Sequence, residues 1–294
     1  MSEVTKKKVQ ISERLPSPSG VAMQVVTLAE NPNASLRQIT TAIQTDPALA
    51  GQMLKLVNAP INGIARKVGS VSTAVTLLGP QTVKSAALAF SLTANHRTGQ
   101  CVGFDYDLYW SDALARGVAA RHLAAKERTL APDEAFTCGL LCQIGRLALA
   151  CVFPSEYGLI CGERDPFALC QSEREQFGLD HNDMSAQMIK SWGLPELHAA
   201  AIRYQDDPDI GGLKSGSRDH RLAQLLQAAG RMAALLLDQK ADADVATQAA
   251  DGPQLSGFTL ECMLELIPKV RDDWIETGRL FSIKTVALAS AASK

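Results

Sequence analysis

Apolar residues recur at spacings of three and four along most of this 294-residue chain. Alternating runs rich in β-branched residues, which are typical of strands, are few. A period near 3.6 places apolar side chains on one face of a helix, and such a face has to be buried against other elements. The sequence therefore predicts an all-α fold in which several helices share a core.

The segment that begins at Asp46 illustrates how these helices are encoded. Asp46 can accept hydrogen bonds from free backbone N–H groups of the first turn, and Pro47 suits the first helical position. The apolar stripe expected to be buried consists of Leu49, Met53, Leu56 and Val57. Asn58 follows, and its amide is expected either to end the helix or to hold a neighbouring loop.

Breaks in the helical pattern predict how the chain is divided. A short helix over 71–78 should stop at Gly79 and Pro80, before an apolar helix over 83–92. A connection near 93–107, which contains glycines and polar residues, predicts the boundary between two helical subdomains.

The second half is expected to begin with an amphipathic helix over 110–126. A helix then opens at residue 132 and ends at 153–154, and a polar loop covers 205–217. Residues 218–294 form a C-terminal helical extension, in which 259–292 should hold two helices broken near Gly278. Residues 1–11 are expected to be a flexible N-terminus.

Composition excludes several classes of partner. The formal charge of −2 and the pI near 6.2 give no general attraction to nucleic acid or to an anionic membrane. The sequence has no run of about 18 uncharged apolar residues and no secretory signal pattern. We therefore expect a cytoplasmic protein that binds neither nucleic acid nor membrane. Seven cysteines, an odd number, are expected to be reduced thiols.

The stretch 137–147 carries the most specific chemical signal. It reads Thr-Cys-Gly-Leu-Leu-Cys-Gln-Ile-Gly-Arg-Leu. It resembles the metal-site helix of the HD superfamily of metal-dependent phosphohydrolases, Gly-Leu-Leu-His-Asp-Ile-Gly-Lys/Arg. The His and Asp that bind the metal in that superfamily correspond to Cys142 and Gln143, whereas the motif glycines remain as Gly139 and Gly145. The resemblance implies a metal site that has lost its central ligands.

Further segments over about 12–208 narrow the resemblance to the HDOD family, HD-related bacterial output modules that are regarded as non-catalytic. They are Leu-Pro-Ser-Pro at 15–18, Asp-Pro-Ala-Leu-Ala at 46–50, Leu-Gly at 78–79, Phe-Gly at 177–178, Asp-His at 180–181 and Trp-Gly-Leu-Pro at 192–195. The residues that this resemblance marks as structural are Asp46, Pro47, Asn58, Gly79, Trp110, Gly139, Gly145, Gly178, Trp192 and Pro195. The resemblance implies a multi-helix HDOD domain.

The same resemblance marks a degenerate site. Its members are Asp112, Cys142, Gln143, Glu173, His181, Gln205 and Asp206. Asp112 stands where the family usually offers a His, and Gln205-Asp206 replaces a His-His pair found in many HDOD sequences. His181 survives, with Glu173 as a carboxylate partner or Asp180 and Asp183 as neighbours at a helix N-terminus. We therefore expect no catalytic residue, no bound metal and no cofactor.

These features predict a non-catalytic bacterial signalling or regulatory module that acts through protein–protein interaction. Its expected partners are unidentified signalling proteins or a second copy in a homodimer. One alternative is an HD-type phosphohydrolase or phosphodiesterase with altered ligands, for instance zinc held by Cys142, His181 and Asp112. Another is a sensor that binds a nucleotide or other small ligand in the former metal cavity. The C-terminal helices are expected either to contact partners or to cap the core.

Overall fold

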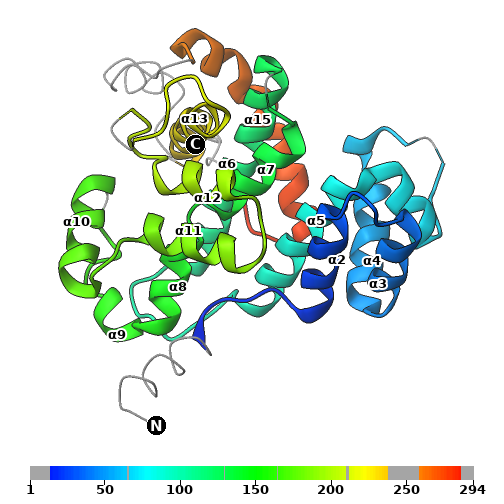
Figure 1. Ribbon diagram of the computed structural model, residues 1–294, viewed down its shortest axis with the longest axis horizontal. Coiled ribbons are helices and arrows are strands. Elements are labelled where there is room, and N and C mark those ends of the chain that lie inside the picture. The colour runs from blue at the N-terminus through cyan, green and yellow to red at the C-terminus, as the bar shows by residue number, and fades with distance from the viewer. Residues whose placement is uncertain are drawn as a thin grey trace, which may run out of the picture.

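The computed structural model describes residues 14–64, 66–128, 130–163, 165–209, 212–237 and 258–285. Every regular element in these residues is helical, which confirms the predicted all-α class (Figure 1). The elements are α2 (Gly20–Glu30), α3 (Leu36–Gln44), α4 (Pro47–Val57), η1 (Pro60–Asn62), α5 (Val71–Asn95), α6 (Tyr106–Glu127), α7 (Pro132–Leu141), α8 (Ile144–Val152), α9 (Pro154–Tyr157), α10 (Pro166–Phe177), α11 (His181–Ser191), α12 (Glu196–Arg203), α13 (Arg218–Leu237) and α15 (Leu260–Phe281). The flexible N-terminus predicted for 1–11 lies outside the described residues, as do parts of the predicted C-terminal extension.

Helices α2, α3 and α4 pack on α5 at one end of the molecule (Figure 1). The start of α4 is as predicted, because the Asp46 carboxylate accepts from the backbone N–H of Ala48 at 3.0 Å and of Leu49 at 3.1 Å. A cap of this kind stabilises a protein by about 1 kcal/mol. All four residues of the predicted stripe, Leu49, Met53, Leu56 and Val57, are buried.

Asn58 combines both of its predicted roles. It caps α4 at its C-terminus, and its Nδ2 donates to the carbonyl oxygens of Leu54 and Val68, each at 2.8 Å. Its Oδ1 accepts from the Val68 N–H, so the amide fixes the following loop against α4. The predicted interruption at Gly79 is also present, since Gly79 has φ +77° within α5 and Pro80 follows it as helical geometry resumes.

Helix α6 lies at the centre and packs against α7, α13 and α15. It begins at Tyr106, capped by Asp105, rather than at Trp110. The prediction of an amphipathic helix is wrong, because the four consecutive positions 117–120 are all buried and therefore face every side of the helix. A helix enclosed on several sides needs small residues, and this segment supplies alanines and Gly117. Trp110 is buried, and its Nε1 donates to the His96 carbonyl oxygen at 2.8 Å.

The helix predicted from 132 to 153 is divided in two at the degenerate motif. Helix α7 ends at Leu141 and α8 begins at Ile144, because Gln143 leaves helical geometry with φ −104° and ψ 12°. The flanking glycines allow close packing. A Cβ at Gly139 would lie 2.6 Å from the Arg116 carbonyl oxygen, and one at Gly145 would lie 2.0 Å from the His181 carbonyl oxygen. The motif glycines thus set how closely α6 and α11 approach this segment.

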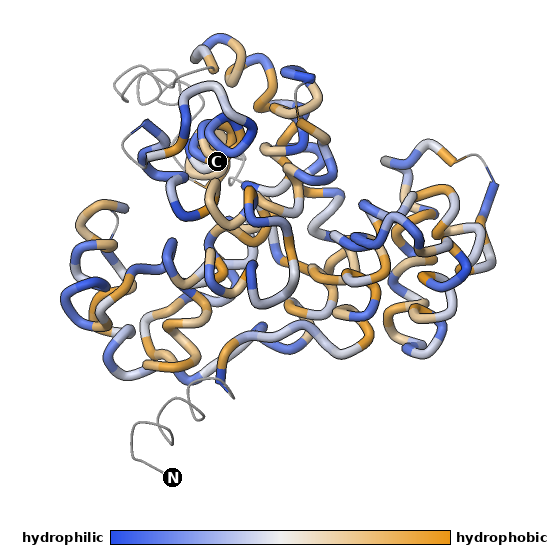
Figure 2. The backbone as a smooth tube through the Cα atoms, viewed as in Figure 1, coloured by the Kyte–Doolittle hydropathy of each residue, from blue (hydrophilic) through white to orange (hydrophobic). Residues whose placement is uncertain are grey.

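Residues Pro132–Val152 are long and apolar enough to cross a membrane, but 89% of the apolar window is buried inside the protein. The apolar surface of α7 and α8 is therefore used in packing against other helices. Figure 2 shows the same arrangement, with hydrophobic segments gathered where helices meet and hydrophilic residues along much of the outer loops.

The described part of the C-terminal extension belongs to the same core as the preceding helices. Trp274 of α15 is buried, and its Nε1 donates to the Ser111 carbonyl oxygen of α6 at 3.1 Å. The break predicted near Gly278 falls after Phe281, where α15 ends, and most of the second helix predicted for 259–292 lies outside the described residues. A Cβ at Gly278 would meet the Thr285 Cγ2 at 2.4 Å, so this glycine makes room for the returning chain. Helices α13 and α15 therefore cap the core.

Candidate functional site

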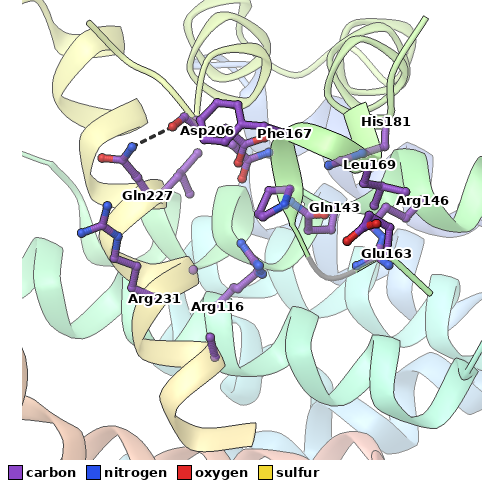
Figure 3. A pocket seen from close by; sticks show the side chains of 15 residues that line it. Arg116, Gln143, Arg146, Glu163, Phe167, Leu169, His181, Asp206, Gln227 and Arg231 are labelled. Atoms are coloured by element: carbon purple, nitrogen blue, oxygen red, sulfur yellow. Dashed lines mark hydrogen bonds between the residues drawn. The ribbon is translucent and has the colours of Figure 1, made fainter. Parts of the chain in front are cut away.

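A cavity of about 330 Å³ lies where α6, α8, α11 and α13 meet (Figure 3). It is lined by Arg116, Gln143, Arg146, Glu163, Pro166, Phe167, Leu169, His181, Gln205, Asp206, Leu226, Gln227, Gly230, Arg231 and Ala234. Four residues of the predicted degenerate site, Gln143, His181, Gln205 and Asp206, are among the lining. The other three, Asp112, Cys142 and Glu173, each bond to a lining residue. The structure therefore brings all seven to one place.

The His181 side of this cavity is a closed hydrogen-bond network. Glu173 is fully buried, and its Oε2 accepts from the backbone N–H of His181 at 2.8 Å. The same oxygen lies 2.7 Å from the His181 Nδ1, and Oε1 accepts from the Tyr157 hydroxyl at 3.1 Å. Asp180 caps α11 by accepting from the Asp183 N–H at 2.8 Å. His181 thus has the helix-N-terminal position and the Glu173 partner that the sequence suggested.

Arg146 extends this network toward the cavity. Its Nε donates to the Tyr157 hydroxyl at 3.4 Å and its Nη2 to the Cys161 carbonyl oxygen at 3.2 Å. Burial raises the pKa of Tyr157, so this hydroxyl remains protonated and can donate to Glu173 while it accepts from Arg146. Burial also opposes the charge of Arg146, but Tyr157 favours it and the pKa of Arg146 stays above its usual value.

Cys142 and Asp112 each have a hydrogen-bond partner within the protein. The Cys142 thiol is fully buried and donates to the Gly139 carbonyl oxygen at 3.1 Å. Burial raises its pKa to about 12, whereas a metal ligand has to be a thiolate. Asp112 accepts from the Arg116 Nε at 2.8 Å. In the alternative zinc set of Cys142, His181 and Asp112, the thiol and the carboxylate are therefore bonded to other groups of the protein.

Among the described residues, a different group of three has side-chain atoms close enough together to bind one metal ion. Cys170, His181 and Asp206 each place one such atom within 4.8 Å of the others. Thiolate, imidazole and carboxylate all bind zinc. Burial, followed by the nearby carboxylate of Asp206, raises the pKa of Cys170, so its thiol is neutral as the site stands. The sequence offers Cys170 only as one of several cysteines that could supply a thiolate, and no motif pairs it with His181 and Asp206.

Gln205 is held by groups other than Gln143. Its Nε2 donates to the Cys142 carbonyl oxygen at 3.0 Å and to the Asn182 Oδ1 at 2.7 Å. Asn182 in turn donates to the Asp206 Oδ2 at 2.5 Å. The Gln205 Oε1 is buried and has no hydrogen-bond partner. A buried acceptor without a donor is costly, so the hydrogen-bond network around Gln205 is incomplete.

Three arginines that sequence analysis did not include also line the cavity. Arg116 comes from α6, Arg146 from α8 and Arg231 from α13. Figure 3 shows Arg116 reaching toward the cavity between the other two. Arg146 occupies the basic position of the HD-like motif and Arg116 lies one turn after Asp112, so both had a local signal. Arg231 lies beyond the motifs and had none.

The chain belongs to the HDOD family. The model of the HDOD domain matches residues 15–208, which confirms the resemblance read from the sequence. The matched part contains α6, α8 and α11, whereas α13 and its Arg231 follow it. One wall of the cavity therefore comes from outside the part that defines the family.

The chain is also similar to individual proteins. An uncharacterized protein of Treponema pallidum (strain Nichols) is 26% identical over 212 residues, which is 69% of this chain and 40% of that protein. The chain thus spans less than half of that relative. The MmoQ response regulator of Methylococcus capsulatus str. Bath is 34% identical, with 90% of this chain and 97% of that chain covered and a TM-score of 0.47. A proposed phosphohydrolase from Shewanella amazonensis SB2B is 24% identical, with 94% and 97% covered and a TM-score of 0.72, and shares the fold.

Proposed function

We propose that this HDOD protein is a non-catalytic regulatory module that transmits a signal through contacts with other proteins, located in the cytoplasm. Membership of the HDOD family supports the regulatory role. The observation that best supports the absence of catalysis is the pairing of the degenerate site's own groups. Asp112 bonds to Arg116, Cys142 to Gly139 and His181 to Glu173. An HD-type reaction would need such groups to converge on a metal that keeps an open coordination position.

The competing function is a phosphohydrolase with an altered metal site. Its support is the trio Cys170, His181 and Asp206. Asn182 and Glu173 already bond to two of these residues, which gives the trio a set of supporting hydrogen bonds. The two functions make opposite predictions about turnover.

The test is an assay of phosphomonoester and phosphodiester hydrolysis with added zinc, manganese or iron. We expect no metal-dependent turnover by the native protein. We also expect none from the Cys142→His/Gln143→Asp double variant, because Asp112 and Gln205 remain unsuited to a metal. Turnover that Cys170→Ser abolishes would contradict the proposal and establish the altered site.

Interaction is tested separately by sedimentation velocity and by reciprocal affinity capture from cells that express the protein natively. We expect either a concentration-dependent homodimer or one protein recovered reproducibly in both directions. A strict monomer without a reciprocal partner would contradict the interaction part of the proposal.

A further inference from the structure

We propose that the cavity binds a nucleoside monophosphate, with Arg116, Arg146 and Arg231 holding the phosphate. This inference deepens the proposed function, because it takes the site to be free of metal and supplies a ligand to which a regulatory module could respond. The cavity carries positive charge from three arginines. Three helices, α6, α8 and α13, each place one arginine on the cavity. A guanidinium presents several N–H donors in a planar fork that matches phosphate oxygens.

Arg146 is the arginine whose charge most needs an anion. Its two printed hydrogen bonds go to neutral oxygens, those of Tyr157 and Cys161. No carboxylate within the described part of the chain forms an ion pair with it. A largely buried cation without a counter-charge is unfavourable. Asp112 favours the charge of Arg146 from a distance but forms no ion pair with it, so a phosphate in the adjacent cavity would be its directly bonded counter-charge.

The carboxylates of the cavity do not cancel this preference. Asp206 accepts from Asn182 at 2.5 Å, and Asp112 is paired with Arg116 behind the lining. Glu163 also lines the cavity, but its side chain is exposed. Asn182 is a neutral donor and leaves the charge of Asp206 in place, but the lining still holds three arginines against two carboxylates, Asp206 and Glu163. The Arg116 pair leaves other guanidinium N–H groups to contact a ligand.

Two further features select an organic phosphate over a simple ion. The Gln205 Oε1 is buried without a donor and belongs to a lining residue, so a ligand that reaches this depth could donate an N–H or O–H to it. Phe167 lines the same cavity yet is 62% exposed, which leaves its ring face available to a planar base. The volume, about 330 Å³, lies at the lower end for small-molecule sites and suits one nucleoside monophosphate better than a dinucleotide.

The position of the cavity would let such a ligand affect the fold. Arg231 and Gln227 belong to α13, and Gln227 also donates to the Asp206 carbonyl oxygen at 2.8 Å (Figure 3). A ligand held by Arg116, Arg146 and Arg231 would therefore fasten α13 to the matched HDOD helices. A ligand that binds the folded state but not the unfolded state raises the melting temperature by mass action.

The experiment is calorimetric titration in EDTA with AMP, GMP, CMP and UMP, and with adenosine and guanosine as phosphate-free probes. We expect saturable binding of at least one monophosphate and at least about tenfold weaker binding of its nucleoside. Arg231→Gln should weaken the monophosphate about tenfold or more. Arg221→Gln, on the same helix but not in the cavity lining, should leave the affinity unchanged, and melting curves of both variants confirm that they are folded.

Three results would overturn the inference: no binding of any monophosphate, equal binding of nucleoside and monophosphate, or full affinity in folded Arg231→Gln. Full affinity in folded Arg231→Gln would mean that the monophosphate binds at a site other than this cavity. Failure here leaves the proposed function standing, since that rests on turnover and partner capture. Conversely, hydrolysis of a bound monophosphate would contradict the proposed function while confirming that the cavity binds it.

Discussion

The two walls of the cavity differ in how their polar groups are satisfied. On the His181 wall, the protein supplies partners for Glu173, His181 and Tyr157 within one buried network. On the arginine wall, Arg146 bonds to neutral oxygens and the Gln205 Oε1 has no partner. The difference indicates that one wall has become structural, whereas the other retains groups that a ligand could complete.

The largest effect should come from Glu173 on the structural wall. Glu173→Ala removes the acceptor for the His181 N–H, the His181 ring and the Tyr157 hydroxyl, all of them buried. We expect a loss of about 3–5 kcal/mol in unfolding free energy, measured by urea denaturation. Glu175→Ala on the same helix is exposed and should change it by less than about 0.5 kcal/mol. A loss below about 1 kcal/mol for Glu173→Ala would mean that the network is not structural.

A second test concerns the contact between the motif and α11. Gly145→Ala would place a Cβ 2.0 Å from the His181 carbonyl oxygen, so α8 or α11 has to shift. We expect about 1–3 kcal/mol of destabilisation in chemical denaturation. Gly162→Ala has no neighbour within 4 Å of the new Cβ and serves as the control. Equal stability of the two variants would show that Gly145 does not set this packing.

The link between α7 and α13 should respond to acid. The hydrogen bond from His198 lowers the pKa of Glu134, although burial opposes this, and Arg218 also pairs with it. Because the pKa is lower in the folded state, the stabilisation is present above the ordinary value of 4.5 and is lost as pH falls through the folded value. Glu134→Gln should therefore flatten the fall in melting temperature between about pH 5 and about pH 3. An unchanged slope relative to the native protein would contradict this.

The smallest effect on stability is expected at the arginine wall. Arg231 is partly exposed, and burial lowers its pKa. Arg231→Gln should change the unfolding free energy by no more than about 0.5 kcal/mol, as measured by denaturation without ligand. The expected loss in unfolding free energy is thus much smaller for Arg231→Gln than for Glu173→Ala. A loss as large as that of Glu173→Ala would place Arg231 in the structural network instead.

Local chemistry explains what the sequence could predict about the fold. The start of α4 depends on Asp46 and Pro47, which act on backbone groups of the next turn, so the pattern was sufficient. The burial around α6, the division at Gln143 and the continuation of α15 past Gly278 to Phe281 were missed. Each depends on how distant segments pack, such as Thr285 against Gly278, and no local pattern encodes that.

The site divides in the same way. His181 and Glu173 were paired in advance because they belong to one motif, and the structure places them 2.7 Å apart. The grouping of Cys170 with His181 and the place of Arg231 on the cavity were not found, because both depend on where α10 and α13 come to lie. The substitution of Cys142 was visible, but its raised pKa and its bond to Gly139 follow from burial.

The central claim is that the former HD centre is a binding pocket without a metal. It is tested most directly by elemental mass spectrometry of protein purified without a metal-binding tag. We predict zinc, iron and manganese far below one ion per chain. Near-stoichiometric metal that survives dialysis and is lost in Cys170→Ser would contradict the account and direct attention to hydrolysis.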